Sequence, residues 1–364
     1  MTGVKCAAHS INLAIKDIAQ LEWATKQLKL MKTAVKFLKR HQKTMAILKK
    51  HSPSRGLLLP NDTRFGTSVI MVQRVVDLKP ALRNVAVDEE FEAYPDDRSV
   101  KLATRRLGRE EEGGAWFELE FFLAVTVPYY ELVRLADGTQ PQAAQLYHKL
   151  RVLLEPLEEK FNTMPGWNIL QDRFVQILTI HNRRREYLSS PVYCAAFALS
   201  PLYQSASLAD CDNNQPVEDV RTMAQRLRLN LGRTPTTAKT AIAAAGEWTD
   251  GGPAGKDMTQ LALFKAGKFS DHKDLASAGK VSPQAWWHTL GRPGLDELAT
   301  LACFVLSTVP AAAGCERNWS LYGAVTGGQH ARISPERAAK LVYVRANTRL
   351  LHREATKEQA DYEA

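Results

Sequence analysis

The stretch that decides the fold runs from residue 286 to residue 351 and reads WWHTLGRPGLDELATLACFVLSTVPAAAGCERNWSLYGAVTGGQHARISPERAAKLVYVRANTRLL. Its first part carries apolar residues at three- and four-residue spacing, which predicts a helix with one apolar face: Leu295, Leu298, Leu301, Ala302 and Val305. Pro310 ends this pattern, because proline has no N–H to donate and restricts the residue before it. We therefore expect a helix that stops before a hinge of small residues.

Two further helical patterns follow the hinge. The first begins at Cys315 and places Glu316, Trp319 and Ser320 within about one turn. The second begins at Ser334, where a serine N-cap precedes a proline at the first helical position. Apolar residues form a seam along this last helix: Ala338, Leu341, Val342 and Val344. A chain end with this much apolar helical surface is expected to bury it against another surface.

Four blocks of this stretch resemble the C-terminal dimerisation region of hAT-superfamily transposases, above all the hAT-like proteins of plants and oomycetes. They are the pair Trp286 and Trp287, the run LATLACFVLS, the block GCERNWS (314–320) and the run KLVYVRANTRL (340–350). A short block with Cys, Trp and Asn in fixed order, together with further matches at compatible spacing, is a specific signal. The resemblance implies a transposase-derived protein with an RNase H-like fold.

The same resemblance implies that the C-terminal helices associate with a second copy of the chain. We expect the dimerisation surface to use apolar and aromatic residues of these helices: Trp286, Trp287, Trp319, Leu341, Val342 and Val344. Tryptophan anchors often dominate such contacts. At about 25 cal/mol per Å² of buried apolar area, a modest helical interface supplies several kcal/mol before association costs are subtracted.

One carboxylate in this region, Glu316, bears on catalysis. Enzymes with two-metal sites clamp the attacking and leaving oxygens between two ions held by carboxylates. The resemblance places Glu316 at the third metal-binding acid of the family, whose intact members use Mg²⁺ or Mn²⁺. The family takes its other two acids from strands ahead of a Cys-x-x-His helix, and this chain starts just before Cys6. Because a single carboxylate binds magnesium weakly, we expect an N-terminally truncated, catalytically inactive protein without a cofactor. A helix N-terminal acid that pairs with the helix dipole is the alternative interpretation of Glu316.

The N-terminal pattern CAAHSINLAIKDI predicts an amphipathic helix that carries Cys6 and His9. Two such residues make half of a zinc site, which needs two more ligands. No second pair at ligand spacing follows nearby, so we expect a structural role for both. The pattern also resembles the hAT block C-x-x-H-x-L-N-L, a helix that packs behind the active site. Phe65, in NDTRFGT, stands where many hAT members carry a tryptophan near the DNA ends, which leaves that role open.

The segment 24–51 is the most basic part of the chain. It contains many lysines and no aspartate or glutamate, and the acidic residue that last precedes it is Glu22. Apolar residues form a stripe on the opposite side of the predicted helix. A charged helix face is usually only solvated, but cations without a counter-charge also suit a line of phosphates. We take as candidate DNA contacts the cations of this segment and of a second basic cluster: Lys29, Lys32, Lys36, Lys39, Arg40, Lys43, Arg183 and Arg184.

Composition fits an intracellular globular protein with a polyanionic partner. The formal net charge is +9, the isoelectric point is about 9.2, and 45% of the 364 residues are hydrophobic. The five cysteines are scattered and odd in number, which is typical of reduced thiols inside a cell. No apolar run has the length of a membrane span and no signal-peptide pattern opens the chain, so we expect no membrane partner. The resemblance implies a nuclear location, with the cytoplasm as the alternative.

We predict a mostly α fold. In detail we expect a partial RNase H-like α/β core without its N-terminal strands (residues 1–86), interrupted by a large helical insertion (87–280). A C-terminal dimerisation region (281–351) and a charged tail (352–364) complete the chain. Within the insertion, residues 232–256 lack hydrophobic periodicity and are interpreted as a flexible connection.

Three functions remain open at this point. The first is a hAT-transposase-derived protein that dimerises and associates with DNA without catalysis. The alternative is an active DNA transposase, which requires a gene that extends upstream and supplies two aspartates in strands. The second alternative is a non-catalytic DNA-binding protein that acts through its basic segments.

Overall fold

The computed structural model describes residues 6–60, 66–94, 115–138, 140–163, 170–188, 190–203, 215–229, 231, 259–265, 281–289, 296–327 and 333–362. Every regular element within these ranges is a helix, and no strand occurs among them. This confirms the mostly α fold. The RNase H-like core stays a prediction, and the proposed connection at residues 232–256 lies outside the described ranges.

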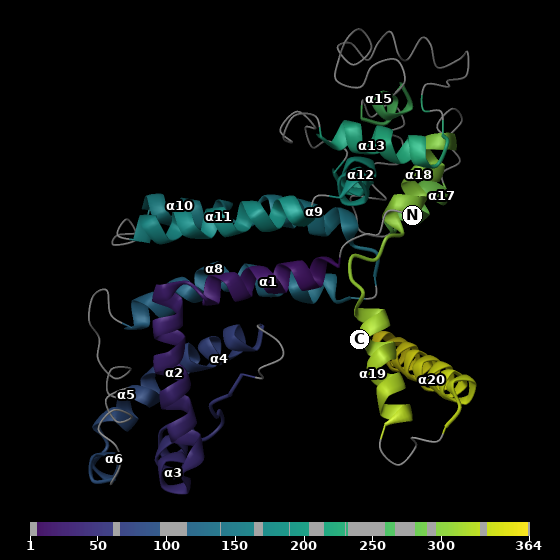
Figure 1. Ribbon diagram of the computed structural model, residues 1–364. Helices are drawn as coiled ribbons and strands as arrows, with labels where there is room; N and C mark the ends of the chain where they lie inside the picture. Colours follow the sequence, from purple (N-terminus) through teal and green to yellow (C-terminus); the bar gives the residue numbers. More distant parts are fainter. Residues whose placement is uncertain are drawn as a thin grey trace. The chain divides into compact units, whose positions relative to one another are not determined.

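The chain forms two compact units. Unit 1 comprises residues 1–136 and 140–310, and unit 2 comprises residues 137–139 and 311–364. Figure 1 labels the α-helices of unit 1, which have these bounds: α1 (Ala7–Ala19), α2 (Glu22–Arg40), α3 (Gln42–His51), α4 (Gly66–Asp77), α5 (Lys79–Val87), α6 (Glu89–Glu92), α8 (Ala115–Ala136), α9 (Ala143–Arg151), α10 (Glu155–Thr163), α11 (Gln171–Leu188), α12 (Pro191–Leu199), α13 (Gln215–Arg226), α15 (Thr259–Lys265), α17 (Pro283–Thr289) and α18 (Asp296–Leu306). A short 3-10 helix, η2 (Pro201–Tyr203), follows α12. Unit 2 contains α19 (Ala313–Thr326) and α20 (Pro335–Tyr362).

Helix α1 is the organising element of the first half of unit 1. Its apolar residues Ile11, Ile15 and Ile18 recur at helical spacing and are fully buried where α1 packs on α8 and α11. At its start, the Ala7 N–H donates to the Pro310 carbonyl over 2.8 Å. The first helix and the last residue of unit 1 are therefore joined directly.

Helix α8 is apolar on nearly all sides, and other helices of unit 1 cover it. Trp23 of α2 packs on Phe121 and Phe122, with ring centroids 5.2 and 6.4 Å apart. On α4, a Cβ at Gly66 would lie 2.9 Å from the ring of Tyr130, so the close approach of α4 and α8 requires glycine there. No helix among the described residues is long and apolar enough to cross a lipid bilayer.

The second half of unit 1 is built around α12. Every residue from Val192 to Leu199 is buried, because α9, α13 and α18 pack around this short helix. Trp287 of α17 donates its indole N–H to the Leu199 carbonyl over 2.8 Å. Its ring and that of Trp286 pack on Phe264 of α15.

The two tryptophans are 3% and 2% exposed, in the order Trp286 and Trp287. Their covered position within unit 1 differs from the prediction that they belong to a dimerisation surface. The physical reason is that α15 and the end of α12 supply apolar partners within the same subunit. The pair serves the core of unit 1.

Unit 2 is a pair of helices. Leu321 and Val325 of α19 and Ala338 of α20 are buried where the two helices pack together. At the start of α20, the Arg337 N–H donates to the Ser334 hydroxyl over 3.4 Å, as the predicted serine cap requires. Two helices alone can bury only part of their apolar surface, which leaves other residues of this pair exposed.

Candidate nucleic-acid interface and self-association surface

Helix α2 carries a basic face, defined here by Lys29, Lys32 and Lys36. These residues lie three and four positions apart and so share one side of the helix. Met31 and Leu38 lie on the opposite side and are fully buried. Burial of one side thus fixes which way the lysines point: Lys29 and Lys36 are exposed, and Lys32 is half-buried.

The basic face lines a hollow between α2 and α4. The hollow has a volume of about 480 Å³, and Ser68 and Met71 of α4 form its other side together with Pro60. Hydroxyl and aliphatic residues of the α1–α2 region complete the lining: Ala19, Thr25, Leu28 and Thr33. Among the described residues that line it there is no carboxylate. Ser68 lies in the first turn of α4, at the positive end of that helix dipole. The hollow is therefore electropositive.

The remaining predicted cations of this segment extend the basic character without lining the hollow. Lys39 and Arg40 are exposed at the end of α2, and Lys43 is exposed on α3. Further along, Lys50 pairs with Asp88 over 3.1 Å and with Glu90 over 3.7 Å. The charge of Lys50 at the end of α3 is thus neutralised by Asp88 and Glu90, whereas no carboxylate is among the described residues that line the hollow.

Asp88 is the acid that accounts for this neutralisation. Its carboxylate accepts hydrogen bonds from His51, Lys50 and the Glu90 N–H, and it caps the N-terminus of α6. The bonds from His51 and Lys50, in that order, lower its pKa to about 2. Asp88 is therefore ionised at neutral pH and holds α3 and α6 together.

The second predicted basic cluster is engaged within unit 1. Arg183 and Arg184 of α11 both donate to the Asp17 carboxylate of α1, over 2.8 and 2.5 Å. Arg184 is half-buried and also donates through its Nε, whereas Arg183 remains largely exposed. The geometry gives Arg184 a structural task between α1 and α11, and leaves Arg183 as the member of the pair that faces solvent.

Three residues were singled out from the sequence for a structural or metal-binding role. Cys6 is half-buried at the N-cap of α1, and His9 is exposed on that helix. In the described ranges, no group of three or more His, Cys, Asp or Glu residues is placed to hold a metal ion. Phe65 lies outside the described residues. The backbone of Glu316 belongs to α19, but its side chain lies outside what the structure describes.

In unit 2, α20 presents a row of exposed apolar side chains. Leu341, Val344 and Leu351 are 40%, 58% and 66% exposed, and they follow the three- and seven-residue steps of a heptad seam. Thr348 occupies the remaining seam position and donates its hydroxyl to the Val344 carbonyl over 2.8 Å. Its polar group is thus satisfied within the helix and does not oppose burial. These four residues are called the α20 stripe below.

Aromatic residues lie exposed in the same unit. Trp319 of α19 is 72% exposed and packs edge-on against Tyr322, while Tyr343 of α20 is 71% exposed. Val342 was predicted to share the dimerisation surface, but it is only half-exposed. It lies one turn after the buried Ala338, on a different side of α20 from the stripe. Exposed aromatic and aliphatic groups of this size are typical of protein interaction surfaces.

Some members of these surfaces were not recognised from the sequence. Leu351 continues the heptad steps of Leu341 and Val344, so its spacing was a usable signal. Ser68 and Met71 line the basic hollow because of how α4 packs on α2, which no local pattern reveals.

Comparison of the chain with protein-family models gives no match, and comparison with curated proteins gives none either.

Proposed function

We propose that this chain is a hAT-transposase-derived protein that self-associates through the α20 stripe of unit 2. The observation that carries the proposal is the row Leu341, Val344 and Leu351, left exposed on one of the two helices that the structure describes in unit 2. A heptad seam is complementary to itself, so a second copy of α20 fits it in register.

A comparison of burial free energy with association cost supports a dimer that needs both the α20 stripe and the exposed aromatic rings of unit 2. Full burial of a Leu or Val side chain contributes about 1.5–3 kcal/mol. Association costs on the order of 4–15 kcal/mol in lost freedom of motion. The free energy gained by burying the stripe residues of two copies is therefore close to this association cost. Burial of the exposed rings of Trp319 and Tyr343 contributes further stabilisation. A reversible, concentration-dependent dimer is the expected form.

Sedimentation of the full chain over a range of concentrations tests the proposal. Leu341→Asp places a charge in the stripe and should weaken dimerisation at least about thirtyfold, the equivalent of about 2 kcal/mol. Val175→Asp is the matched control, because Val175 is an exposed valine in the second turn of α11 in unit 1. A chain that stays monomeric at all concentrations, or a dimer that Leu341→Asp leaves intact, would contradict the proposal.

A second function, association with the phosphate backbone of DNA, is favoured by the basic hollow. Lys29, Lys32 and Lys36 face this hollow without a lining carboxylate among the described residues. Each lysine that neutralises a phosphate releases a counterion, which makes binding fall steeply with salt. Such contacts position a protein on DNA and carry no sequence information, so the expected binding is independent of sequence.

Fluorescence anisotropy with a labelled duplex, repeated at several salt concentrations, tests this second function. Replacing Lys29, Lys32 and Lys36 together by glutamine should reduce the magnitude of the slope of log affinity against log salt concentration by about two to three. Replacing Lys26, Lys43 and Lys49 by glutamine is the control, because this change removes the same charge from exposed positions of α2 and α3 that do not line the hollow. Equal losses in the two triple variants would assign the binding to net charge and overturn the role of the hollow.

We further propose that the chain does not catalyse strand cleavage by itself. The proposal rests on the single acid, Glu316, that the hAT resemblance supplies, because one carboxylate is a weak ligand for Mg²⁺ or Mn²⁺. A nicking assay on supercoiled DNA with added Mg²⁺ tests it. Cleavage that is abolished by Glu316→Ala would establish the active transposase instead.

A further inference from the structure

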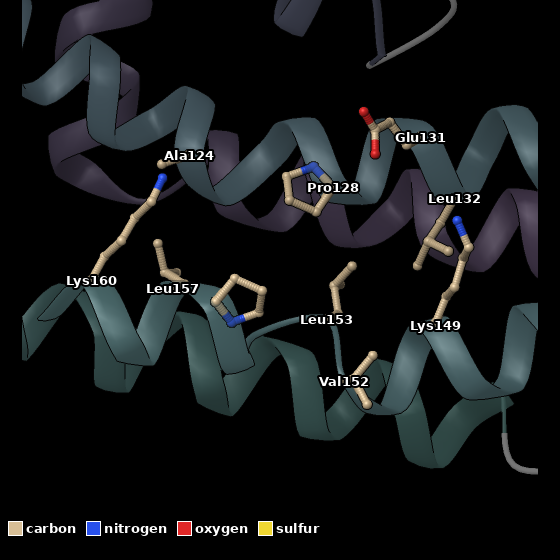
Figure 2. A pocket seen from close by; sticks show the side chains of 10 residues that line it. Ala124, Pro128, Glu131, Leu132, Lys149, Val152, Leu153, Leu157 and Lys160 are labelled. Atoms are coloured by element: carbon tan, nitrogen blue, oxygen red, sulfur yellow. The ribbon is translucent and has the colours of Figure 1, made fainter. Parts of the chain in front are cut away.

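A polar cluster joins three helices of unit 1. Trp23 and Gln27 belong to α2, Glu118 lies in the first turn of α8, and Arg173 lies in the first turn of α11. Trp23 and Gln27 are four positions apart, so they share one side of α2. Glu118 precedes by more than one turn the part of α8 that lines the apolar pocket drawn in Figure 2, so the polar cluster and that pocket use different stretches of this helix.

The Glu118 carboxylate holds the cluster together. Its Oε1 accepts a hydrogen bond from Arg173 Nη2 over 2.8 Å, and its Oε2 accepts one from Gln27 Nε2. The Arg173 guanidinium also lies over the Trp23 ring, with Cζ 5.3 Å from the ring centroid. Each of the four side chains therefore contacts another member, and α2, α8 and α11 meet at one acid.

Three polar atoms of the cluster are buried from solvent and have no hydrogen-bond partner among the residues that the structure describes: Trp23 Nε1, Arg173 Nη1 and Gln27 Oε1. The Trp23 residue as a whole is only 9% exposed. The two nitrogens can only donate, whereas the amide oxygen can only accept. Because Gln27 turns its Nε2 to the Glu118 carboxylate, its oxygen must find a donor elsewhere. Buried polar groups without partners are unfavourable, so the cluster requires a group that accepts twice and donates once.

We propose that one water molecule is bound in this cluster. Its oxygen accepts from Trp23 Nε1–H and from Arg173 Nη1–H, and one of its hydrogens is donated to Gln27 Oε1. A buried water typically makes about three hydrogen bonds to such groups.

The chemistry of the three atoms favours water over an ion. A chloride ion accepts from both nitrogens, but it cannot donate to Gln27 Oε1 and it is repelled by the Glu118 carboxylate. A metal cation binds the amide oxygen, but it faces the Arg173 guanidinium and the donor N–H of Trp23. A neutral molecule that accepts and donates through one atom fits all three partners.

The position of the site gives the water a role in fastening α2. Because the three atoms are buried, the water can leave only when α2 moves away from α8 or α11. The residence time of the water therefore reports the local opening of this helix contact. The site stands independently of the functions proposed for the basic hollow and the α20 stripe.

Magnetic relaxation dispersion of water oxygen-17, measured on the full chain, counts internal waters with long residence times. Trp23→Phe keeps an aromatic ring beside Arg173 and removes the indole N–H, whereas Gln27→Met keeps the side-chain length and removes the acceptor. Each variant should lower the count by about one relative to the unchanged chain. Trp319→Phe is the matched control, because it removes an indole N–H from a residue that is 72% exposed, and it should leave the count unchanged.

A crystal structure of the unchanged full chain locates the water and does not depend on the folding of any variant. One peak of electron density should lie about 2.7–3.2 Å from all three atoms. Separate waters on the three atoms, a direct bond from Trp23 or Arg173 to Gln27 Oε1, or a water count that neither variant lowers would overturn the proposal.

Discussion

The Tyr129 hydroxyl on α8 and the His181 imidazole on α11 share a hydrogen bond of 2.8 Å inside unit 1, between Oη and Nδ1. Burial, and then the charge of Arg185, lower the pKa of His181 to about 4. Burial also raises the pKa of Tyr129. Both groups are therefore neutral at physiological pH, and the bond links the two helices that flank α1.

This pair predicts a pH dependence of stability. The pKa of His181 is about 4 in the folded chain and 6.5 ordinarily, so the unfolded chain binds more protons between these values. Stability should be complete above pH 6.5 and fall as the pH drops toward 4, by an amount on the order of 3 kcal/mol. Urea denaturation at several pH values measures it. His181→Gln should flatten the curve in this window, and an unchanged slope would assign the effect to other groups.

The pairing of Asp17 with Arg183 and Arg184 predicts a loss of stability that is specific to Arg184. Asp17→Ala leaves the half-buried Arg184 guanidinium without its carboxylate and should reduce the free energy of unfolding by about 1–3 kcal/mol. Arg183→Ala should cost less than about 1 kcal/mol, because Arg183 is exposed. A double-mutant cycle for each pair measures the coupling. Equal coupling energies for the two arginines would contradict this division of roles.

The two classes of tryptophan predict different phenotypes. Trp287→Ala removes a buried ring and its hydrogen bond to Leu199, and should destabilise unit 1 by about 3–5 kcal/mol at any protein concentration. Trp319→Ala removes an exposed ring and should weaken dimerisation while the unfolding of unit 1 is unchanged. Chemical denaturation and sedimentation of both variants separate the outcomes. A Trp319 variant with full dimer affinity would remove that ring from the proposed surface.

Salt should act in opposite directions on the two proposed functions. The α20 stripe is flanked by exposed cations, Arg337, Lys340 and Arg345, which repel each other when two copies meet. Screening this repulsion should tighten the dimer as salt rises, whereas DNA binding at the basic hollow should weaken. Sedimentation and anisotropy over one series of salt concentrations compare the two. A dimer that dissociates with salt would indicate an interface held by charge pairs instead of the apolar stripe.

Local signals predicted the boundaries of the C-terminal helices well. α18 ends at Leu306, ahead of Pro310, and α20 begins directly after Ser334, whose hydroxyl accepts the Arg337 N–H. These features depend on proline geometry and on a side chain a few positions away, both of which are legible in the sequence. The basic side of α2 was also legible, because Met31 and Leu38 alternate with the lysines at helical spacing.

Partners that are distant in the sequence were not predictable in the same way. The buried position of Trp287 depends on the Leu199 carbonyl, and the engagement of Arg184 depends on Asp17 of the first helix. Trp287 and Trp319 both follow a polar residue by three positions, Gln284 and Glu316, so the local pattern does not separate the buried ring from the exposed one. The packing of α17 on α18 and η2, together with the bond from Trp287 to the Leu199 carbonyl, distinguishes Trp287 from Trp319.

The bond between the Ala7 N–H and the Pro310 carbonyl has a consequence for synthesis on the ribosome. Tyr193 also donates its hydroxyl to the same carbonyl, over 3.2 Å, so one oxygen near the end of unit 1 accepts from two distant segments. A nascent chain offers that acceptor only after residue 310 has left the exit tunnel. Helix α1 must therefore wait for the segment that contains Pro310 before its final docking, and folding of this unit is completed only after translation has passed residue 310.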